Sequence, residues 1–343
     1  MRKKSLIPTI KDIAVMCNVS TQTVSRVINK RPDVASETRI LVEKAILESN
    51  YHPSLVARSL VKQRSNTIGV ILSGLRYLGV SQTLNGIASE CESSGYTLVL
   101  KELPAFDTPN FLPVIQSLIS HQVEGIIFAA PELADNVNKA QSQLPPSCPP
   151  IIFLKSHPNP AFTTISIDNF GGAYTAVEYL IKCGRKKVGL ITGPLDWLES
   201  RQRKDGWEAA LRDAGIAPDT CAWKEGQWSS SSGEMAIQEL YKELPSMDAV
   251  FVSNDQMALG VLHFCQRNQI FIPQNLAVIG FDDLAEGAYF YPPLSTTTHP
   301  LRELGSMAVK SLLDQIEGKR ASKQHHEIVL PTKLVIREST PKI

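Results

Sequence analysis

The sequence predicts an α/β protein that consists of a small helical N-terminal module and a larger body of parallel sheets. Three observations support this prediction. The length of 343 residues exceeds one ordinary domain. The first 50 residues show only helical periodicity, and from Thr67 onward short apolar runs alternate with helical segments. Such alternation is typical of parallel sheets that are covered by helices on both faces.

The composition is that of a globular protein, because 43% of the residues are hydrophobic and 20% are charged. No apolar stretch approaches the roughly 20 residues that span a membrane, and the basic N-terminus is not followed by the apolar region of a secretory signal. The six cysteines form no C-x-x-C pair. We therefore expect reduced core cysteines in a cytoplasmic protein without a bound metal or cofactor.

The charge is distributed unevenly along the chain. Residues 1–64 contain 12 Lys/Arg and 5 Asp/Glu, a net charge of +7, although the whole chain carries only +1. A basic head on an acidic body is expected where only the head meets a polyanion such as nucleic acid. Basic N-termini are common, so the charge alone does not decide the function.

Residues 9–50 predict three short helices. Thr9 and Asp12 resemble a capping pair at the start of the first helix, and Ser20 is a good N-cap for the second. The third helix is expected from Ser36 to about Ser49. Apolar residues at helical spacing predict the buried faces. They are Ile10, Ile13, Ala14 and Cys17 in the first helix, Val24, Val27 and Ile28 in the second, and Ile40, Leu41, Ala45 and Leu47 in the third.

Two short helices joined by a tight turn and closed by a third form a helix-turn-helix module. In the second helix, the face opposite the apolar residues carries Gln22, Arg26 and Asn29. Gln can pair with adenine and Arg with guanine in the major groove, and Thr21 and Gln22 lie at the helix N-terminus, which usually reaches the bases. Any exposed helix face is polar, but this one lacks acidic residues, so we expect Gln22 and Arg26 to contact bases.

The segment 51–66 has the composition of a linker that folds against DNA, because it contains no acidic residue between His52 and Asn66. Residues 54–62 can form one short helix, too short to be stable alone in water. Its apolar residues need a partner. Either they pack on the rest of the protein or a leucine inserts into the minor groove, and their spacing leaves both alternatives open.

The run TIKDIAVMCNVSTQTVSRVINK, followed by YHPSLVARSL, resembles the LacI–GalR family of bacterial repressors, and the similarity continues to IVLPTKLVIREST. This resemblance implies that Leu60 is the hinge-helix leucine that inserts at the centre of a palindromic operator. It also implies two further sets of DNA contacts. The base-contacting residues would be Thr21, Gln22 and Arg26, and the phosphate-contacting residues would be Thr9, Ser25 and Asn29.

The body shows two series of strands and helices. The expected strands are TIGVIL, YTLVLKE, GIIFAA and PPIIFL in the first series, and KKVGLIT, DAVFVS and LAVIGF in the second. The expected helices cover about 81–93, 110–121, 171–183, 199–214, 230–243 and 255–268. Ligands of such sheets bind beyond the carboxyl ends of the strands. The polar or turn-forming residues at these ends are Ser73, Gly193, Pro194, Asn254, Asp255, Gln256, Asp282 and Asp283. Among them, we expect Ser73, Asn254, Gln256 and Asp282 to bind the effector.

Short polar groups at these positions can bind hydroxyls, and Trp228 can stack on a sugar face, although Asn254 could equally be a helix cap. The family resemblance implies two lobes with the effector between them. It places lobe 1 at about 67–167 and 297–327, lobe 2 at about 168–296 and 328–340, and chain crossings near Ile167, Thr297 and Ile328. It implies that the effector contacts Arg203, Trp228, Asn254, Gln256 and Asp282.

One position departs from the family pattern. Where a sugar-binding member of the family has an acid at the end of the strand PPIIFL, this chain has Lys155. The lysine could meet an anionic group of the effector, or its side chain could face water, and we favour the second interpretation.

These observations predict a helix-turn-helix domain at 1–50, a hinge at 51–66 and an effector-binding and dimerisation domain at 67–343. We expect a homodimeric repressor of carbohydrate-utilisation genes that binds a palindromic operator and responds to a sugar or glycoside. Two alternatives remain. A sugar-binding transport protein would leave residues 1–64 unexplained, and an enzyme would need a nucleophile–base pair that the sequence does not show. Whether the effector releases or promotes DNA binding is left open.

Overall fold

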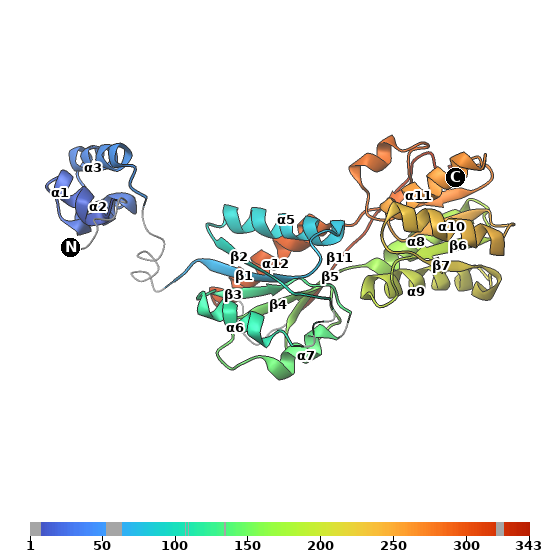
Figure 1. The fold of residues 1–343 in the computed structure, drawn as a ribbon, viewed down its shortest axis with the longest axis horizontal. Coiled ribbons are helices and arrows are strands. Elements are labelled where there is room, and N and C mark those ends of the chain that lie inside the picture. The colour runs from blue at the N-terminus through green and yellow to red at the C-terminus, as the bar shows by residue number, and fades with distance from the viewer. Residues whose placement is uncertain (1–7, 53–63, 107, 109, 134, 320–325) are drawn as a thin grey trace. The chain divides into compact units, whose positions relative to one another are not determined.

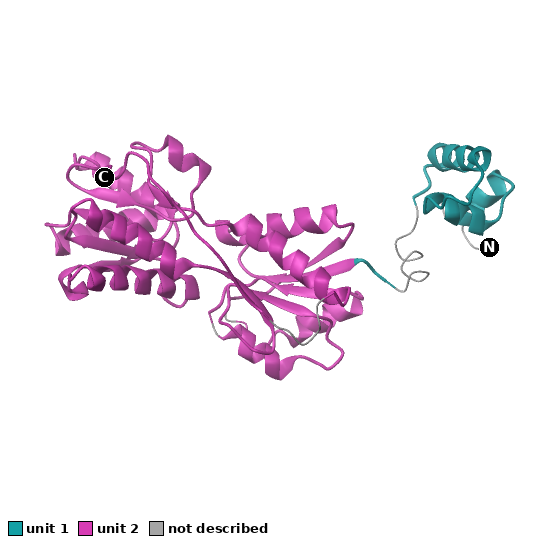
Figure 2. Ribbon diagram, turned by 180° about the vertical axis from the view of Figure 1, so that it is seen from behind, with its two compact units in different colours: residues 1–66 teal, residues 67–343 magenta. Residues whose placement is uncertain are grey.

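The structure is a computed structural model that describes residues 8–52, 64–106, 108, 110–133, 135–319 and 326–343. It divides into two compact units, Met1–Asn66 and Thr67–Ile343 (Figures 1 and 2). The expected linker helix with Leu60 lies outside the described residues. Within the described part of the chain, no helix is long and apolar enough to cross a membrane.

The N-terminal unit contains the three expected helices, α1 (Ile10–Met16), α2 (Thr21–Ile28) and α3 (Ser36–Ser49). The N-cap role of Ser20 is confirmed, since its hydroxyl accepts a hydrogen bond of 3.0 Å from the backbone N–H of Thr23. The predicted apolar faces of the first two helices pack together in one small core. Its buried side chains include Ile13, Ala14, Cys17, Val24, Val27, Val42 and Ala45.

The buried face of α3 differs from the predicted one. Ala45 is buried as expected, but Val42 is the other fully buried residue of the helix. Ile40, Leu41 and Leu47 are 66%, 49% and 81% exposed. The prediction was wrong at these positions because α3 contains apolar residues on several faces, so their spacing does not define the orientation of the helix.

The first half of the body, called lobe 1 below, is built around a six-stranded parallel sheet with the strand order β11-β5-β4-β3-β1-β2. The strands are β1 (Thr67–Leu72), β2 (Thr97–Glu102), β3 (Gly125–Phe128), β4 (Ile151–Leu154), β5 (Thr163–Ile167) and β11 (Glu327–Leu330). The helices are α5 (Leu78–Ser93), α6 (Leu112–Ser120), α7 (Asn136–Gln143) and α12 (Leu301–Ile316). Figure 1 shows α5 and α12 on one face of this sheet and α6 and α7 on the other.

Successive side chains of the lobe 1 strands point to opposite faces of the sheet, as in any β-strand, and pack in two different hydrophobic cores. In β4, Ile152 and Leu154 pack under α5 and α12, whereas Ile151 and Phe153 join the core on the opposite face. Both faces are apolar, which explains why the strands read as continuous hydrophobic runs in the sequence.

The second half of the body, called lobe 2, contains a four-stranded parallel sheet with the order β7-β6-β8-β9. Its strands are β6 (Val188–Thr192), β7 (Trp223–Glu225), β8 (Ala249–Val252) and β9 (Ala277–Ile279). Its helices are α8 (Asn169–Lys182), α9 (Leu198–Asp213), α10 (Ser230–Glu243), α11 (Asp255–Arg267) and two short 3-10 helices, Pro218–Thr220 and Ala285–Tyr289. The two predicted parallel sheets are therefore confirmed.

The chain passes between the lobes at three places. It leaves β5 and enters α8, it leaves β10 (Thr296–Thr297) and enters α12, and it leaves β11 for β12 (Leu334–Val335). The strands β10 and β12 form an antiparallel pair that contacts α8 of lobe 2. Residues that follow β4 in lobe 1 and β8 and β9 in lobe 2 line one pocket between the lobes.

Candidate functional sites

The helix α2 exposes the side chains that the sequence nominated for base contacts. Thr21, Gln22 and Arg26 are exposed, while Val24 and Val27 on the opposite face are buried. Within this unit, α2 therefore presents one polar face to its surroundings. The helix contains no acidic residue, so this face suits a polyanion.

Two of the nominated polar residues, Arg26 and Asn29, have intramolecular partners. Arg26 lies 3.5 Å from Asp33, and both side chains are about half exposed. The Asn29 side chain donates to the Ser25 carbonyl at 2.8 Å. An exposed ion pair contributes little to stability, so Arg26 can release Asp33 at small cost. The contact with Asp33 was not predicted from the sequence, because Asp33 lies outside α2.

Thr9 is the N-cap residue of α1, as predicted. Its backbone N–H and its hydroxyl both donate to Asp12 Oδ2, at 2.8 and 2.7 Å. The contact forms the capping pair that the sequence indicated. Thr9 is exposed, and its assignment to a DNA phosphate stays a prediction, like those of Ser25 and Asn29.

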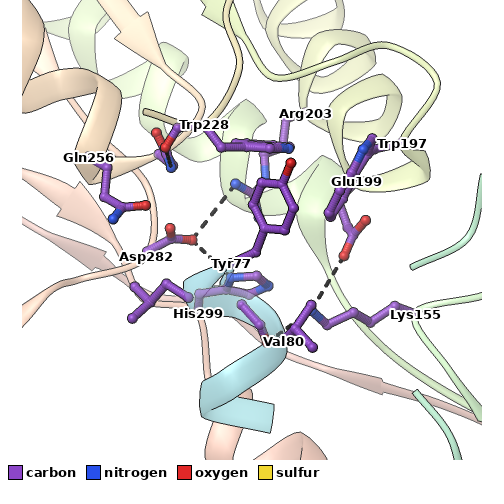
Figure 3. Close-up of a pocket in the computed structure, with 13 residues that line it drawn as sticks. Tyr77, Val80, Lys155, Trp197, Glu199, Arg203, Trp228, Gln256, Asp282 and His299 are labelled. Carbon is purple, nitrogen blue, oxygen red and sulfur yellow. Dashed lines mark hydrogen bonds and ion pairs between the residues drawn. The ribbon is translucent and has the colours of Figure 1, made fainter. Parts of the chain in front are cut away.

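The body contains a small pocket between its lobes (Figure 3). The cavity measures about 50 Å³, which is room for one or two water molecules and far below the roughly 300–1,000 Å³ of typical ligand sites. A ligand must therefore move the lining side chains or the lobes. The lining residues are Tyr77, Leu78, Gly79, Val80 and Lys155 from lobe 1, Trp197, Glu199, Arg203, Trp228, Asn254, Gln256 and Asp282 from lobe 2, and His299 from the second passage.

Five of the six nominated effector residues line this pocket, and Ser73 does not. The Ser73 side chain is buried, its hydroxyl lies 3.5 Å from the Leu103 carbonyl, and the residue lines a separate cavity near Phe106. The position of Ser73 after a strand correctly placed it at the edge of the sheet. It did not indicate which of two neighbouring cavities the side chain faces.

Arg203 lies inside the pocket wall and is held on all sides. Its Nε donates to Asn169 Oδ1 at 2.9 Å, its Nη1 donates to the Ser253 carbonyl, and the guanidinium lies 3.8 Å from the centroid of the Phe281 ring. Burial lowers the pKa of Arg203, but an arginine remains charged in a protein. The charge is met by Asp282, whose Oδ1 is 3.8 Å from Nη1.

Trp228 also lies beside Arg203, with the guanidinium 5.8 Å from its ring centroid. Its backbone has a φ of 63°, which is uncommon for a bulky residue. The indole lies against Gly193, where any side chain would overlap the ring. The glycine at the end of β6 is therefore required for the position of Trp228.

Asp282 follows β9 with a φ of 118°, a region that costs an ordinary residue about 1–3 kcal/mol and occurs mostly at functional sites. His299 Nδ1 lies 2.9 Å from Asp282 Oδ1. Burial lowers the pKa of His299 to about 4, and the hydrogen bond to Asp282 opposes this shift only in part. His299 is therefore neutral at neutral pH, with its proton on Nδ1 because the carboxylate can only accept.

Asn254 has the helix-cap role that the sequence left open. Its Oδ1 accepts from the Met257 backbone N–H at 2.9 Å, and its Nδ2 donates to the Trp228 carbonyl at 3.2 Å. The amide therefore joins α11 to the segment that carries the indole. Gln256, two residues later in the first turn of α11, is half-buried and lines the cavity.

Asp255, between these two residues, is buried behind the pocket. Its Oδ1 accepts from the Thr296 hydroxyl at 2.7 Å and its Oδ2 accepts from the Leu284 backbone N–H at 2.8 Å. Burial, followed by the nearby charge of Asp282, raises the pKa of Asp255 to about 8. The carboxyl is thus mostly protonated at neutral pH, and it fastens the second passage between the lobes to the start of α11.

The interpretation that the Lys155 side chain faces water was wrong. It is 6% exposed, and its Nζ lies 3.5 Å from Glu199 Oε1 and 3.4 Å from the Gly79 carbonyl. The backbone of Lys155 is left-handed, with a φ of 54°, and this directs the residue after β4 into the pocket. Figure 3 shows the ion pair across the cavity from Arg203.

Seven lining residues were not predicted from the sequence: Tyr77, Leu78, Gly79, Val80, Trp197, Glu199 and His299. Tyr77 and Trp197 form an edge contact with ring centroids 5.4 Å apart, and Trp197 meets Trp228 at 5.7 Å. Trp197 and Glu199 lie in the same segment as Arg203, so the motif that nominated the arginine could have indicated them. Nothing in the local sequence distinguishes His299.

Three polar atoms of the lining are buried without a hydrogen-bond partner among the described residues. They are Glu199 Oε2, Trp228 Nε1 and His299 Nε2. Buried polar atoms are normally satisfied, and exceptions call for a ligand or a water molecule. Glu199 Oε2 can accept a hydrogen bond, and so can His299 Nε2, because the proton of this imidazole is on Nδ1. Trp228 Nε1 can only donate.

A helix-turn-helix module with a polar, acid-free helix face, joined to a two-lobed body with a polar pocket, defines the class of effector-responsive DNA-binding transcription regulators. The family description "Bacterial regulatory proteins, lacI family" matches residues 9–54, and "Periplasmic binding protein-like domain" matches residues 156–340. This chain belongs to the LacI family and is a DNA-binding transcriptional repressor with an effector-binding domain.

Similar proteins extend over nearly the whole chain. The HTH-type transcriptional repressor PurR of Vibrio atlanticus is 34% identical over 326 residues, covering 94% of this chain and 97% of that protein. A crystal structure of the lac repressor dimer bound to operator and the anti-inducer ONPF has a TM-score of 0.86 and 30% identity, covering 97% and 99% of the two chains. The transcriptional regulator CelR–cellobiose complex has a TM-score of 0.70 and 26% identity, with the same coverage.

Proposed function

We propose that this repressor is controlled by a small sugar or glycoside that binds between the lobes and that it regulates carbohydrate-utilisation genes in the cytoplasm. The observation that carries the proposal is the composition of the pocket. Trp197, Trp228 and Tyr77 supply aromatic surfaces, and the three partnerless polar atoms require both donors and acceptors. A sugar offers apolar ring faces and hydroxyls that both donate and accept. The cellobiose complex of a related regulator supports this choice.

The effector contacts in this proposal are Arg203, Trp228, Asn254, Gln256 and Asp282. Ser73 is omitted because it lines another cavity. No residue is assigned a catalytic role. The domain limits that we propose are 1–50 for the DNA-binding module, 51–66 for the hinge and 67–343 for the body, in agreement with the boundary between compact units at Asn66.

A screen of the full-length protein tests the effector. Melting temperatures are measured with mono- and disaccharides, glycosides, sugar acids, nucleobases and amino acids. A ligand at 100 times its dissociation constant should stabilise the body by about 2.7 kcal/mol. A shift with a neutral sugar supports the proposal. A shift with nucleobases or amino acids alone contradicts it and leaves the DNA-binding function intact.

For DNA binding, we propose base contacts from Thr21, Gln22 and Arg26. Phosphate contacts come from Thr9, Ser25 and Asn29, and Leu60 inserts at the centre of a palindromic operator. Gln22→Ala and Arg26→Ala should each weaken specific binding by about 1–3 kcal/mol and leave ligand binding unchanged. Lys44→Ala is a matched control, because it removes an exposed positive charge from α3 rather than α2. Equal losses in all three variants would contradict base recognition by α2.

We further propose a homodimer, because a two-fold operator needs a two-fold protein in which each module reads one half-site. Effector binding would change the angle between the lobes and so the distance between the two hinges. Sedimentation velocity at micromolar concentration tests the oligomeric state, and a tetramer or monomer would contradict it.

A further inference from the structure

Lys155 and Glu199 form an ion pair between the lobes inside the effector pocket. Lys155 follows β4 of lobe 1, and Glu199 lies in the first turn of α9 in lobe 2. Each side chain is only 6% exposed, and Nζ and Oε1 are 3.5 Å apart. A buried pair of this kind is costly to separate, because removing one partner leaves an uncompensated charge in a desolvated site.

The charges of the described pocket lining balance one another. The two positive groups are Lys155 and Arg203, and the two negative groups are Glu199 and Asp282. Each cation has a carboxylate within 4 Å, at 3.5 Å for Lys155 and 3.8 Å for Arg203. The pocket therefore has no surplus charge that a charged ligand would neutralise. The neutral imidazole of His299 does not change this balance.

The unused hydrogen-bonding capacity of the pocket lies at the same groups. Glu199 Oε1 faces Lys155, while Glu199 Oε2 has no partner among the described residues. His299 Nδ1 is occupied by Asp282, and its Nε2 is free to accept. A ligand must therefore bring at least two donors and an acceptor for Trp228 Nε1 without bringing a net charge.

We infer that the effector is an uncharged polyhydroxy compound and that the Lys155–Glu199 pair determines this charge selectivity. One ligand hydroxyl donates to Glu199 Oε2 while the ammonium of Lys155 balances the carboxylate. An acidic ligand would place a second negative charge beside Glu199, and an amino ligand would place a second positive charge beside Lys155. Discrimination then arises from charges left unpaired in the wrong complex. This inference rests on the proposed function.

The test uses triads of sugars that differ only in charge. D-glucose, D-glucosamine and D-glucuronate form one triad, and D-galactose, D-galactosamine and D-galacturonate form another. Binding to the full-length protein is measured by calorimetric titration. The wild-type protein should bind the neutral member of a triad at least tenfold more tightly than either charged member.

Two single variants change the selectivity in opposite directions. Lys155→Met leaves Glu199 unpaired and should shift the preference toward the amino sugar by at least tenfold relative to the neutral sugar. Glu199→Gln leaves Lys155 unpaired and should shift it equally toward the sugar acid. Lys224→Met is the matched control, because Lys224 pairs with Glu243 outside the pocket, and it should keep the wild-type preference.

The double variant Lys155→Glu, Glu199→Lys separates charge selectivity from loss of folding. It restores a balanced pair, so it should restore the preference for the neutral sugar. Equal binding of all three members by the wild type, or an unchanged preference in both single variants, would overturn the inference while the sugar proposal stands. Failure of every neutral sugar to bind would overturn the proposed function itself. A cooperative urea unfolding transition, followed by the fluorescence of the four tryptophans, all of which lie in the body, verifies that each variant is folded.

Discussion

The raised pKa of Asp255 predicts a stability that falls as the pH rises. In the native state the carboxyl keeps its proton up to about pH 8, whereas its ordinary pKa is 3.8. Between these values the native protein holds a proton that the unfolded chain has released. The free energy of unfolding should therefore lose about 1.4 kcal/mol per pH unit from this group. The stabilisation that the protonated Asp255 provides is complete below about pH 4 and is lost above about pH 8.

The variant Asp255→Asn isolates this effect. An asparagine side chain can accept from the Leu284 N–H and donate to the Thr296 hydroxyl, which are the two contacts of the carboxyl group. It does not titrate, so the stability of the wild type relative to the variant should fall by about 3 kcal/mol between pH 5 and pH 7.5. Thr296→Ser is the control. It keeps Asp255 and a hydroxyl at position 296, so its free energy of unfolding should change with pH as that of the wild type does.

Urea unfolding followed by tryptophan fluorescence suits this measurement. All four tryptophans lie in lobe 2, where Asp255 also lies, and the DNA-binding module contains none. The fluorescence transition therefore reports the unfolding of the relevant lobe. A difference between wild type and variant that is independent of pH, or that rises with pH, would mean that Asp255 is ionised in the native state, and the reasoning from burial would be refuted.

Three further predictions concern other elements. Ser20→Ala removes the N-cap of α2 and should destabilise the module by about 1 kcal/mol, seen as about fivefold faster amide hydrogen exchange in α2; unchanged exchange would contradict it. Gly260→Ala should destabilise lobe 2 by about 1–3 kcal/mol in urea, because a Cβ there would overlap the Ser230 carbonyl; wild-type stability would refute this. His299 keeps a native pKa of about 4 against an ordinary 6.5, so the wild type should lose stability relative to His299→Gln by about 1.4 kcal/mol per unit as the pH falls from 6.5 to 4. A flat difference across this window, measured in the same urea assay, would show that the imidazole is protonated in the native state.

The sequence was sufficient for elements whose signals are local. The helix Ser36–Ser49 was predicted at its observed bounds, and α10 was as well. The left-handed Asn50 ends the first of these helices, and the Ser229 hydroxyl caps the start of α10. The strand β5 was missed because Thr163, Thr164 and Ser166 interrupt its apolar pattern. These residues are polar although the strand is central and mostly buried.

The pocket was predictable only where a motif or a strand end indicated it. Arg203, Trp228 and Asp282 were found in this way. The environment of Lys155 depends on Glu199, which is distant in the sequence and comes from the other lobe. The neutral state of His299 depends on burial by several elements. Such properties arise from tertiary contacts, which periodicity and spacing do not encode.

The order of the elements along the chain has a consequence for synthesis on the ribosome. The helix α12 covers one face of the lobe 1 sheet at β3, β4 and β5, yet it begins only at Leu301. Five of the six strands of this sheet emerge before α12 does, and β11 emerges after it. The apolar face of the lobe 1 sheet that α12 covers therefore stays exposed in the nascent chain while lobe 2 up to β10 is translated. A chain that ends before residue 301 should be retained by chaperones, even though it contains most of both lobes.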